Sequence, residues 1–252
     1  MKRKVLTVLL FLYICMNGYG QTPGHQPAAN ITLNFVHVAG GKQLHADSMY
    51  LNTFGEQYTV SKFRYYISQI VLTSKSPKVK PVTYDTCLLV DEMKPESKQV
   101  SLYVPAGSYD TISFLLGVDS IRNTSGAQSG ALDPLMDMFW TWNTGYVMAK
   151  LEGTSPVSKL PRHMFEYHIG GFSGTHNVLK TINLPAPQKN VILTSGKQKK
   201  EIVIEVNVNT WFSGVHDLKI AGQPACSSIG ELAQKYADNY SQMFHIRSVN
   251  NE

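Results

Sequence analysis

The chain has 252 residues and a formal net charge of +5. Three of the positive charges, on Lys2, Arg3 and Lys4, lie at the extreme N-terminus, so the remainder is only weakly basic. Because it also has no basic stripe interleaved with aromatic residues, nucleic acid is not an expected partner. Besides Cys15 near the N-terminus, the chain has Cys87 and Cys226. These two can pair in an oxidising compartment, but sequence spacing does not decide whether they do.

The N-terminal residues have the layout of a secretory signal peptide. Basic residues precede an apolar run over 5–15, and Gly18-Tyr-Gly20 supplies small residues for cleavage after Gly20. A membrane-spanning helix needs about 20 apolar residues, and neither this run nor any later segment is long enough. We therefore expect a signal peptide over 1–20, a flexible leader over 21–30, no transmembrane segment, and export to the periplasm, the cell surface or the medium.

Short segments rich in β-branched and aromatic residues follow in close succession. In the first, Ile31-Thr-Leu-Asn-Phe-Val-His-Val38, apolar and polar residues alternate as in a half-buried strand, which places His37 on the inward face. Without a βαβ rhythm, such strands predict an all-β fold: one domain over 31–252 that is an antiparallel β-sandwich of about eight to ten strands. The further strands are expected over 64–73, 82–90, 100–104, 109–116, 146–151, 163–169, 178–184 and 201–208.

One helix is expected near the C-terminus, over 228–244. Ser228 and Glu231 have the spacing of a capping box, in which a hydroxyl and a carboxylate satisfy free N–H groups at a helix start. Apolar and aromatic residues then recur at helical spacing up to Met243. This stripe is expected to pack the helix against the sandwich.

The segment Met138-Phe-Trp-Thr-Trp-Asn-Thr-Gly-Tyr146 concentrates large aromatic residues in a few positions. Each tryptophan needs a large pocket and a partner for its indole N–H. Trp140 and Trp142 are therefore interpreted either as a plug in the core or as the wall of a binding site. The residues alone leave both interpretations open.

The sequence lacks several motifs that mark known enzyme classes. Gly171-Phe-Ser-Gly174 is followed by Thr175, where a nucleophile elbow has its second glycine, and the expected fold lacks the strand-to-helix turn of that motif. No phosphate-binding glycine loop and no H-E-x-x-H zinc motif occurs. A hydrolase using Glu166 and a second carboxylate has little support, and the chain is not expected to be an enzyme.

Histidines are the more informative residues. His168 ends a strand just before Gly170-Gly171, His176 follows, and His37 faces inward on the first strand. Two neutral imidazoles with a weaker third donor suit Cu(I). A hydrogen-bonded core histidine is the alternative for each position.

At these residues the chain resembles the MbnP-like family of exported copper-associated proteins. The resemblance extends over nearly the whole chain after the leader, and the tryptophan-rich segment is its most specific part. Its motifs are Phe35-Val-His37, Arg64-Tyr-Tyr-Ile-Ser68, Leu116-Gly-Val-Asp119, Leu132-Asp-Pro134, Met138–Tyr146, Lys150-Leu-Glu-Gly153, His168-Ile-Gly-Gly171 and Met243-Phe244.

The resemblance implies a secreted β-sandwich that holds copper through two imidazoles, here those of His37 and His168. In some family members an oxidised tryptophan, kynurenine, completes the site, but Glu166 stands where a Trp-x-His pattern would need a tryptophan. Trp140 and Trp142 are then expected to lie beside the site.

The function expected from the resemblance is sequestration or transfer of copper, as Cu(I), with a periplasmic or outer-membrane copper-handling partner. The alternative is a metal-free binding module that recognises a small molecule, a glycan or a protein through its aromatic surface.

Overall fold

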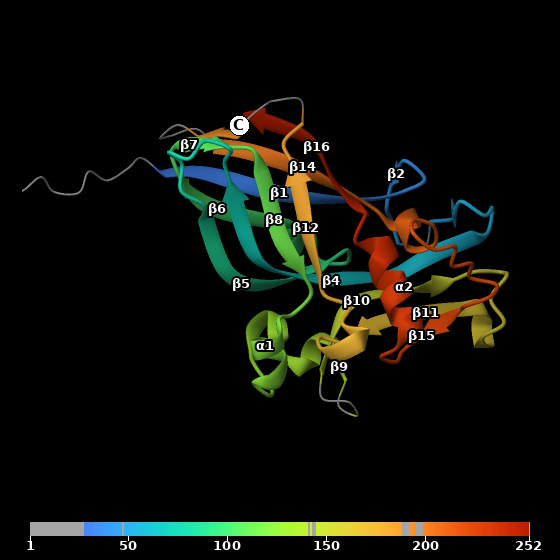
Figure 1. The fold of residues 1–252 in the computed structure, drawn as a ribbon. Coiled ribbons are helices and arrows are strands. Elements are labelled where there is room, and N and C mark those ends of the chain that lie inside the picture. Colours follow the sequence, from blue (N-terminus) through green and yellow to red (C-terminus); the bar gives the residue numbers. More distant parts are fainter. Residues whose placement is uncertain are drawn as a thin grey trace, which may run out of the picture.

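Two curled β-sheets pack face to face in the computed structural model, with α2 against one end (Figure 1). The structure describes residues 28–46, 48–140, 142, 145–187, 192–194 and 199–251. The expected signal peptide and most of the expected leader lie outside these residues. No helix of the described part is long and apolar enough to cross a membrane.

The smaller sheet has five strands in the order β16-β14-β1-β2, with β6 also paired to β1. β1 and β14 run parallel, from Asn30 opposite Lys199 to Val38 opposite Asn207, and the other pairs are antiparallel. The strands are β1 (Ala28–Ala39), β2 (Lys42–Gln43), β6 (Gln99–Pro105), β14 (Lys199–Asn207) and β16 (Phe244–Asn251).

The larger sheet has nine strands and is built around β4, which pairs with both β8 and β10. Its main order is β12-β8-β4-β10-β11-β15, and β3, β5 and β9 join at its margins. The strands are β3 (Tyr50–Leu51), β4 (Gln57–Thr73), β5 (Val82–Asp91), β8 (Thr111–Leu116), β9 (Phe139–Trp140), β10 (Gly145–Thr154), β11 (Met164–Gly170), β12 (Lys180–Pro185) and β15 (Ala225–Cys226).

Short elements complete the described chain. β7 (Gly107–Tyr109) and β13 (Ile192–Thr194) form a two-stranded sheet, and the helices are α1 (Ser120–Thr124) and α2 (Glu231–Tyr240). The 3-10 turns are η1 (Pro95–Lys98), η2 (Gly130–Leu132), η3 (Pro134–Met136), η4 (Pro161–His163), η5 (Gly174–His176) and η6 (Val208–Trp211).

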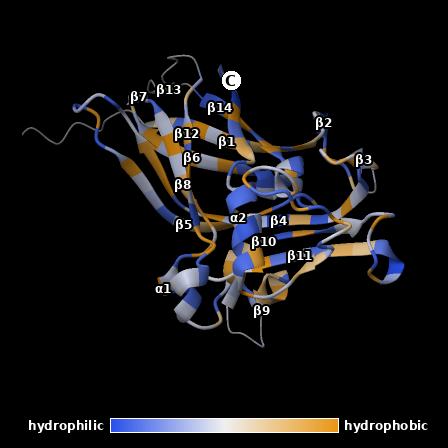
Figure 2. Cartoon of the chain, turned by 45° about the vertical axis from the view of Figure 1, so that its right-hand side comes forward, coloured by the Kyte–Doolittle hydropathy of each residue, from blue (hydrophilic) through white to orange (hydrophobic). Residues whose placement is uncertain are grey.

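The core between the sheets is strongly aromatic. Along the strands of both sheets hydrophobic residues alternate with hydrophilic ones (Figure 2), and the hydrophobic set points inward. Phe35 of β1 meets Tyr65 of β4 and Phe114 of β8 edge to face, at ring-centroid distances of 6.3 and 6.2 Å. Such edge-to-face pairs add to the stabilisation gained by burying the rings.

The sequence prediction of an all-β sandwich with a C-terminal helix is confirmed. Helix α2 packs as its apolar stripe predicts, with Tyr236 against Tyr167 and Tyr240 against Trp211. Its bounds differ from the prediction: it begins after Gly230, makes no side-chain cap, and ends at Tyr240. The chain turns there because β16 follows at once and pairs with β14. The parallel pairing of β1 with β14 also departs from a purely antiparallel sandwich.

Gly153 is predicted to tolerate no side chain. A Cβ atom there would lie 1.8 Å from the carbonyl oxygen of Thr59 and 2.9 Å from the Phe165 ring, next to a register shift in β10. We expect Gly153→Ala to lower the free energy of unfolding by about 3 kcal/mol or more, measured by urea denaturation. Gly222→Ala is the control, because its Cβ would meet only the Lys219 carbonyl at 3.8 Å; equal effects of the two variants would contradict the prediction.

Candidate functional site

His37 lies near the end of β1 and is buried, as the alternation of that strand predicts. Its exposed fraction is 2%. Its Nδ1 is 2.6 Å from Oε2 of Glu92, and its Nε2 is 3.0 Å from the hydroxyl oxygen of Tyr65. The ring also packs edge to face on Phe63, with centroids 4.7 Å apart. Both ring nitrogens therefore have partners within the protein.

The charges around His37 fix its tautomer. Burial lowers the pKa of His37 more than its hydrogen bond to Glu92 raises it, so the imidazole is neutral at pH 7. Burial raises the pKa of Glu92, but hydrogen bonds from His37 and from Lys98, whose Nζ is 2.9 Å away, outweigh it and lower that pKa. An ionised carboxylate only accepts, so Nδ1–H donates to Glu92 and Nε2 accepts from Tyr65.

His168 lies on β11 and is partly accessible. Its Nε2 is 2.8 Å from Oε1 of Glu152, and its side chain is 21% exposed. Burial raises the pKa of Glu152, but the hydrogen bond to His168 and the neighbouring lysine charges outweigh it, so that pKa is lowered. In the described part of the chain, Nδ1 of His168 has no hydrogen-bond partner. Nε2–H therefore donates to the carboxylate, and in the neutral imidazole the lone pair of Nδ1 is free.

The structure does not bring His37 and His168 together. His168 is in register with Lys150 of β10, which is in register with Arg64 of β4, so these three side chains share one face of the larger sheet. Phe63 and Tyr65 flank Arg64 and point to the opposite face, where they contact His37. The two histidines therefore lie on opposite sides of the sheet.

The expected two-histidine copper site is thus not formed in this arrangement. The reason is visible in β11, where Phe165, Tyr167 and Ile169 take the inner face and leave Glu166 and His168 outside. That alternation could have been read from the sequence, but the resemblance supplied motif positions without assigning them to faces. Among the described residues, no group of three or more His, Cys, Asp or Glu side chains is placed to hold a metal ion.

The outer face around His168 carries charged groups that were not expected at a site, here called the outer-face cluster: Lys62, Arg64, Asp91, Asp137, Lys150 and Glu152. Lys150 is the most buried of the cations; its Nζ is 3.0 Å from Oδ2 of Asp137. Burial lowers the pKa of Lys150 in spite of the opposing effect of Asp137. Nζ of Lys62 lies 2.9 Å from Oδ2 of Asp137 and 3.3 Å from Oε2 of Glu152, and so links the two carboxylates. In the sequence, Arg64, Lys150 and Glu152 stand in the motifs of the resemblance, and Lys150 and Glu152 alternate with Leu151 on β10.

Trp140 and Trp142 lie on the same side as His168. Trp140 is buried and packs on Gly170, where a Cβ atom would come within 2.4 Å of its ring. Gly170 is two residues beyond His168 and shares its face. Trp142 is 66% exposed and its ring centroid lies 5.1 Å from that of Trp140. The tryptophan pair is therefore placed near His168, with one ring packed and one at the surface, but away from His37.

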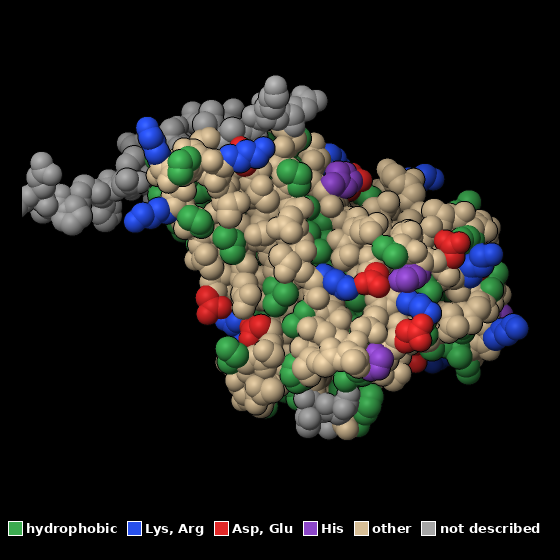
Figure 3. Space-filling view, in the orientation of Figure 1, with side chains coloured by type: hydrophobic (Ala, Val, Ile, Leu, Met, Phe, Trp, Pro, Cys, Tyr) green, Lys and Arg blue, Asp and Glu red, His purple; other side chains and the backbone are tan. Residues whose placement is uncertain are grey.

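The remaining sequence candidates are separated from this site. His176 is exposed, and its Nδ1 is 3.0 Å from the side-chain oxygen of Gln234 on α2. Acidic, basic and histidine side chains gather over α2 (Figure 3), where Asp238 joins Lys180 and His216. Cys87 and Cys226 are free thiols, and burial raises their pKa values to about 12 and about 11.

The neutral, buried state of His37 predicts a specific pH dependence. Its folded pKa lies below the ordinary value of 6.5, so its contribution to stability is present above that pH and is lost as the pH falls towards the folded pKa. We expect the free energy of unfolding to fall below about pH 6.5 in the wild type, and His37→Gln to be less stable with a flatter profile.

His245→Gln is the matched control, since His245 also faces a glutamate, Glu205 at 3.6 Å, but is 57% exposed. Urea denaturation between pH 7.5 and 5 measures all three proteins. A wild-type slope in His37→Gln would contradict the assignment.

Comparisons with known proteins place the chain in a family. The family model described as MbnP matches residues 28–228. The solved structure of MbnP from Methylosinus trichosporium shares 15% sequence identity, covers 89% of this chain and 99% of its own, and superposes with a TM-score of 0.55, which shows a common fold. The search of curated proteins found no match. The family model covers most of the chain, and on that evidence the chain belongs to the MbnP family.

Proposed function

We propose that this chain is an exported, non-enzymatic copper protein of the MbnP family that transfers Cu(I) through His168 on the outer face of the larger sheet. The observation that carries the proposal is the Glu152–His168 pair. Histidines that bind metals typically donate their other ring N–H to a carboxylate, which fixes the tautomer and directs the free lone pair to the metal. Glu152 does this for His168, and the ring is accessible to an ion.

His37 is not part of the proposed site. Its one nitrogen with a lone pair accepts the Tyr65 hydrogen bond, and its ring is buried on the other side of the sheet. Binding copper there would leave the Tyr65 hydroxyl without its acceptor in a buried place, which is costly. We assign His37 a structural role.

The small number of ligands supports transfer over sequestration. The described residues supply one imidazole at this place, with the Trp140–Trp142 pair as a nearby wall. A site with few donors binds weakly and leaves positions for ligands from another molecule. A periplasmic or outer-membrane partner that completes the coordination would take the ion from such a site.

Copper binding is tested by competition with a chromophoric Cu(I) chelator, because a weak site would lose its ion during desalting. We expect His168→Gln and Glu152→Gln each to weaken binding by about tenfold or more. His37→Gln and the matched control His245→Gln are expected to bind as the wild type does. A wild type that does not compete, or loss of binding in His37→Gln with the fold retained by circular dichroism, would overturn the proposal.

Export is tested separately with residues 1–30 fused to a reporter enzyme that is active only outside the cytoplasm. We expect reporter activity, and an N-terminus at Gln21 by mass spectrometry of the processed full chain. Replacing two leucines of the apolar run, Leu9 and Leu10, by arginine is expected to abolish both, because the run must be apolar to act as a signal. An active reporter in that variant would contradict the proposal.

A second candidate is the metal-free binding module, which the exposed Trp142 ring favours. A ring that is 66% exposed and backed by Trp140 offers a flat face for stacking on a sugar or an aromatic ligand. Quenching of tryptophan fluorescence in a ligand screen, repeated with Trp142→Ala, separates this candidate from the first. Copper binding that survives in Trp142→Ala, with no ligand found by quenching, would argue against it.

A further inference from the structure

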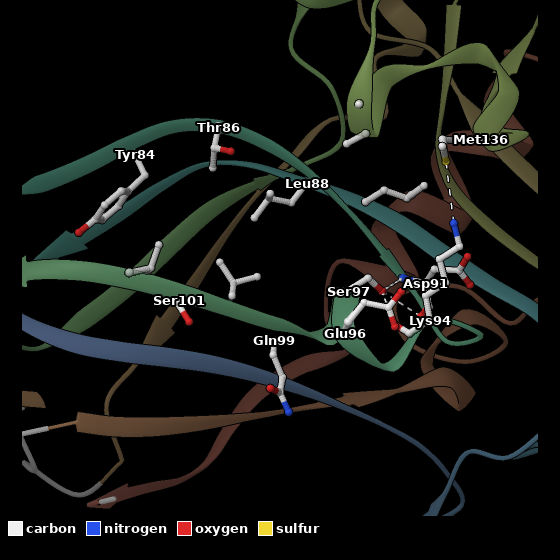
Figure 4. Close-up of a pocket in the computed structure, with 15 residues that line it drawn as sticks. Tyr84, Thr86, Leu88, Asp91, Lys94, Glu96, Ser97, Gln99, Ser101 and Met136 are labelled. Atoms are coloured by element: carbon white, nitrogen blue, oxygen red, sulfur yellow. Dashed lines mark hydrogen bonds between the residues drawn. The ribbon is translucent and has the colours of Figure 1, made fainter.

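A cavity of about 590 Å³ lies between β5 and β6, outside the proposed copper site. Within the described residues, β5 pairs with β4 and β6 pairs with β1, so these consecutive strands belong to different sheets and the space between them is open (Figure 4). Apolar side chains make up most of its wall: Leu88, Leu89, Val100, Leu102, Ala131 and Met136. Its volume is that of a small-molecule site.

Both ends of the cavity are defined by hydrogen bonds. At one end Tyr84 of β5 donates its hydroxyl hydrogen to the carbonyl of Tyr103 on β6. At the other end the Ser97 hydroxyl accepts from the Asp91 N–H, at 2.9 Å, and η1 closes the connection. These two bridges mark the length of the cavity between Tyr84 and Ser97.

The polar end carries the ammonium group of Lys94, an exposed lysine at the rim of the cavity that has no acidic partner among the described residues. Nζ of Lys94 points across the cavity to the thioether sulfur of Met136, 4.0 Å away, and within the described chain it has no carboxylate partner (Figure 4). Asp91 is already neutralised by Arg64, whose Nε is 2.9 Å from Oδ2. Glu96 is exposed and also lines the rim. An ammonium placed beside an apolar wall favours an anionic group on a ligand.

We propose that this cavity binds a monocarboxylate with an apolar chain of fatty-acid type. The chain lies among the leucine, valine and methionine side chains, and the carboxylate lies at Lys94. Removing an alkyl chain from water supplies the affinity, because that gain is proportional to the apolar area buried. The charge of Lys94 supplies the preference for a carboxylate head over an alcohol or an amine. The site is independent of His168 and of copper.

Calorimetric titration of the full processed chain with dodecanoate, dodecanol and dodecylamine, below their aggregation concentrations, tests the proposal. We expect dodecanoate to bind best. Lys94→Met, which keeps the apolar length of the side chain, is expected to weaken dodecanoate binding by about fivefold and to leave dodecanol unchanged. The matched control is Lys75→Met, an exposed lysine outside the cavity lining, which is expected to bind all three compounds as the wild type does.

A second variant locates the site. Ala131→Phe fills the cavity from η2 and is expected to weaken the binding of all three compounds. If it does not fold, Ser101→Trp on β6 serves the same purpose. Binding unchanged in the filled variant would place the ligand elsewhere, and tighter binding of the amine than of the carboxylate would show that Glu96 sets the head group. Either result, or no binding by the wild type, overturns the proposal.

Discussion

The alternation of side chains across β4, β10 and β11 is the constraint on which the rest of the molecule depends. Because successive residues point to opposite faces, the larger sheet separates an aromatic core from a layer of ion pairs. Tyr65 and Tyr167 belong to the core, whereas Arg64 and His168 belong to the charged layer. A ligand set assembled from residues of both layers would need the sheet to open. The alternation therefore decides which residues can act together.

The two histidines have different hydrogen-bond environments on the two sides of the sheet. On the inner side His37 is neutral, and its hydrogen bonds to Glu92 and Tyr65 satisfy polar groups that burial would otherwise penalise. On the outer side His168 uses one nitrogen for Glu152 and keeps the other accessible. The same residue type thus serves packing in one place and is open to chemistry in the other. Burial and the number of partners distinguish the two roles.

The fold was largely predictable from the sequence, because alternation, turn residues and the helical stripe are local signals. The aromatic stripe of α2 and the inward position of His37 were both correctly inferred. What could not be inferred depended on pairing between distant segments. Register between β4, β10 and β11 determines that Lys150, and not His37, is the neighbour of His168. The predicted capping box of α2 was wrong for a local reason. The helix begins after Gly230, two residues later than expected, so Ser228 is not at the capping position.

The parallel pairing of β1 with β14 has a consequence for the timing of folding. Asn30 pairs with Lys199, so the smaller sheet joins residues from opposite ends of the described chain. Contacts of such high sequence separation make folding slow, because the loop between them must be closed first. The edge of β1 that pairs with β14 stays without its partner strand until β14 has been synthesised. For the export proposed above, late closure of the sandwich would keep the chain unfolded, and thin enough to pass a secretion pore, until β14 has been made.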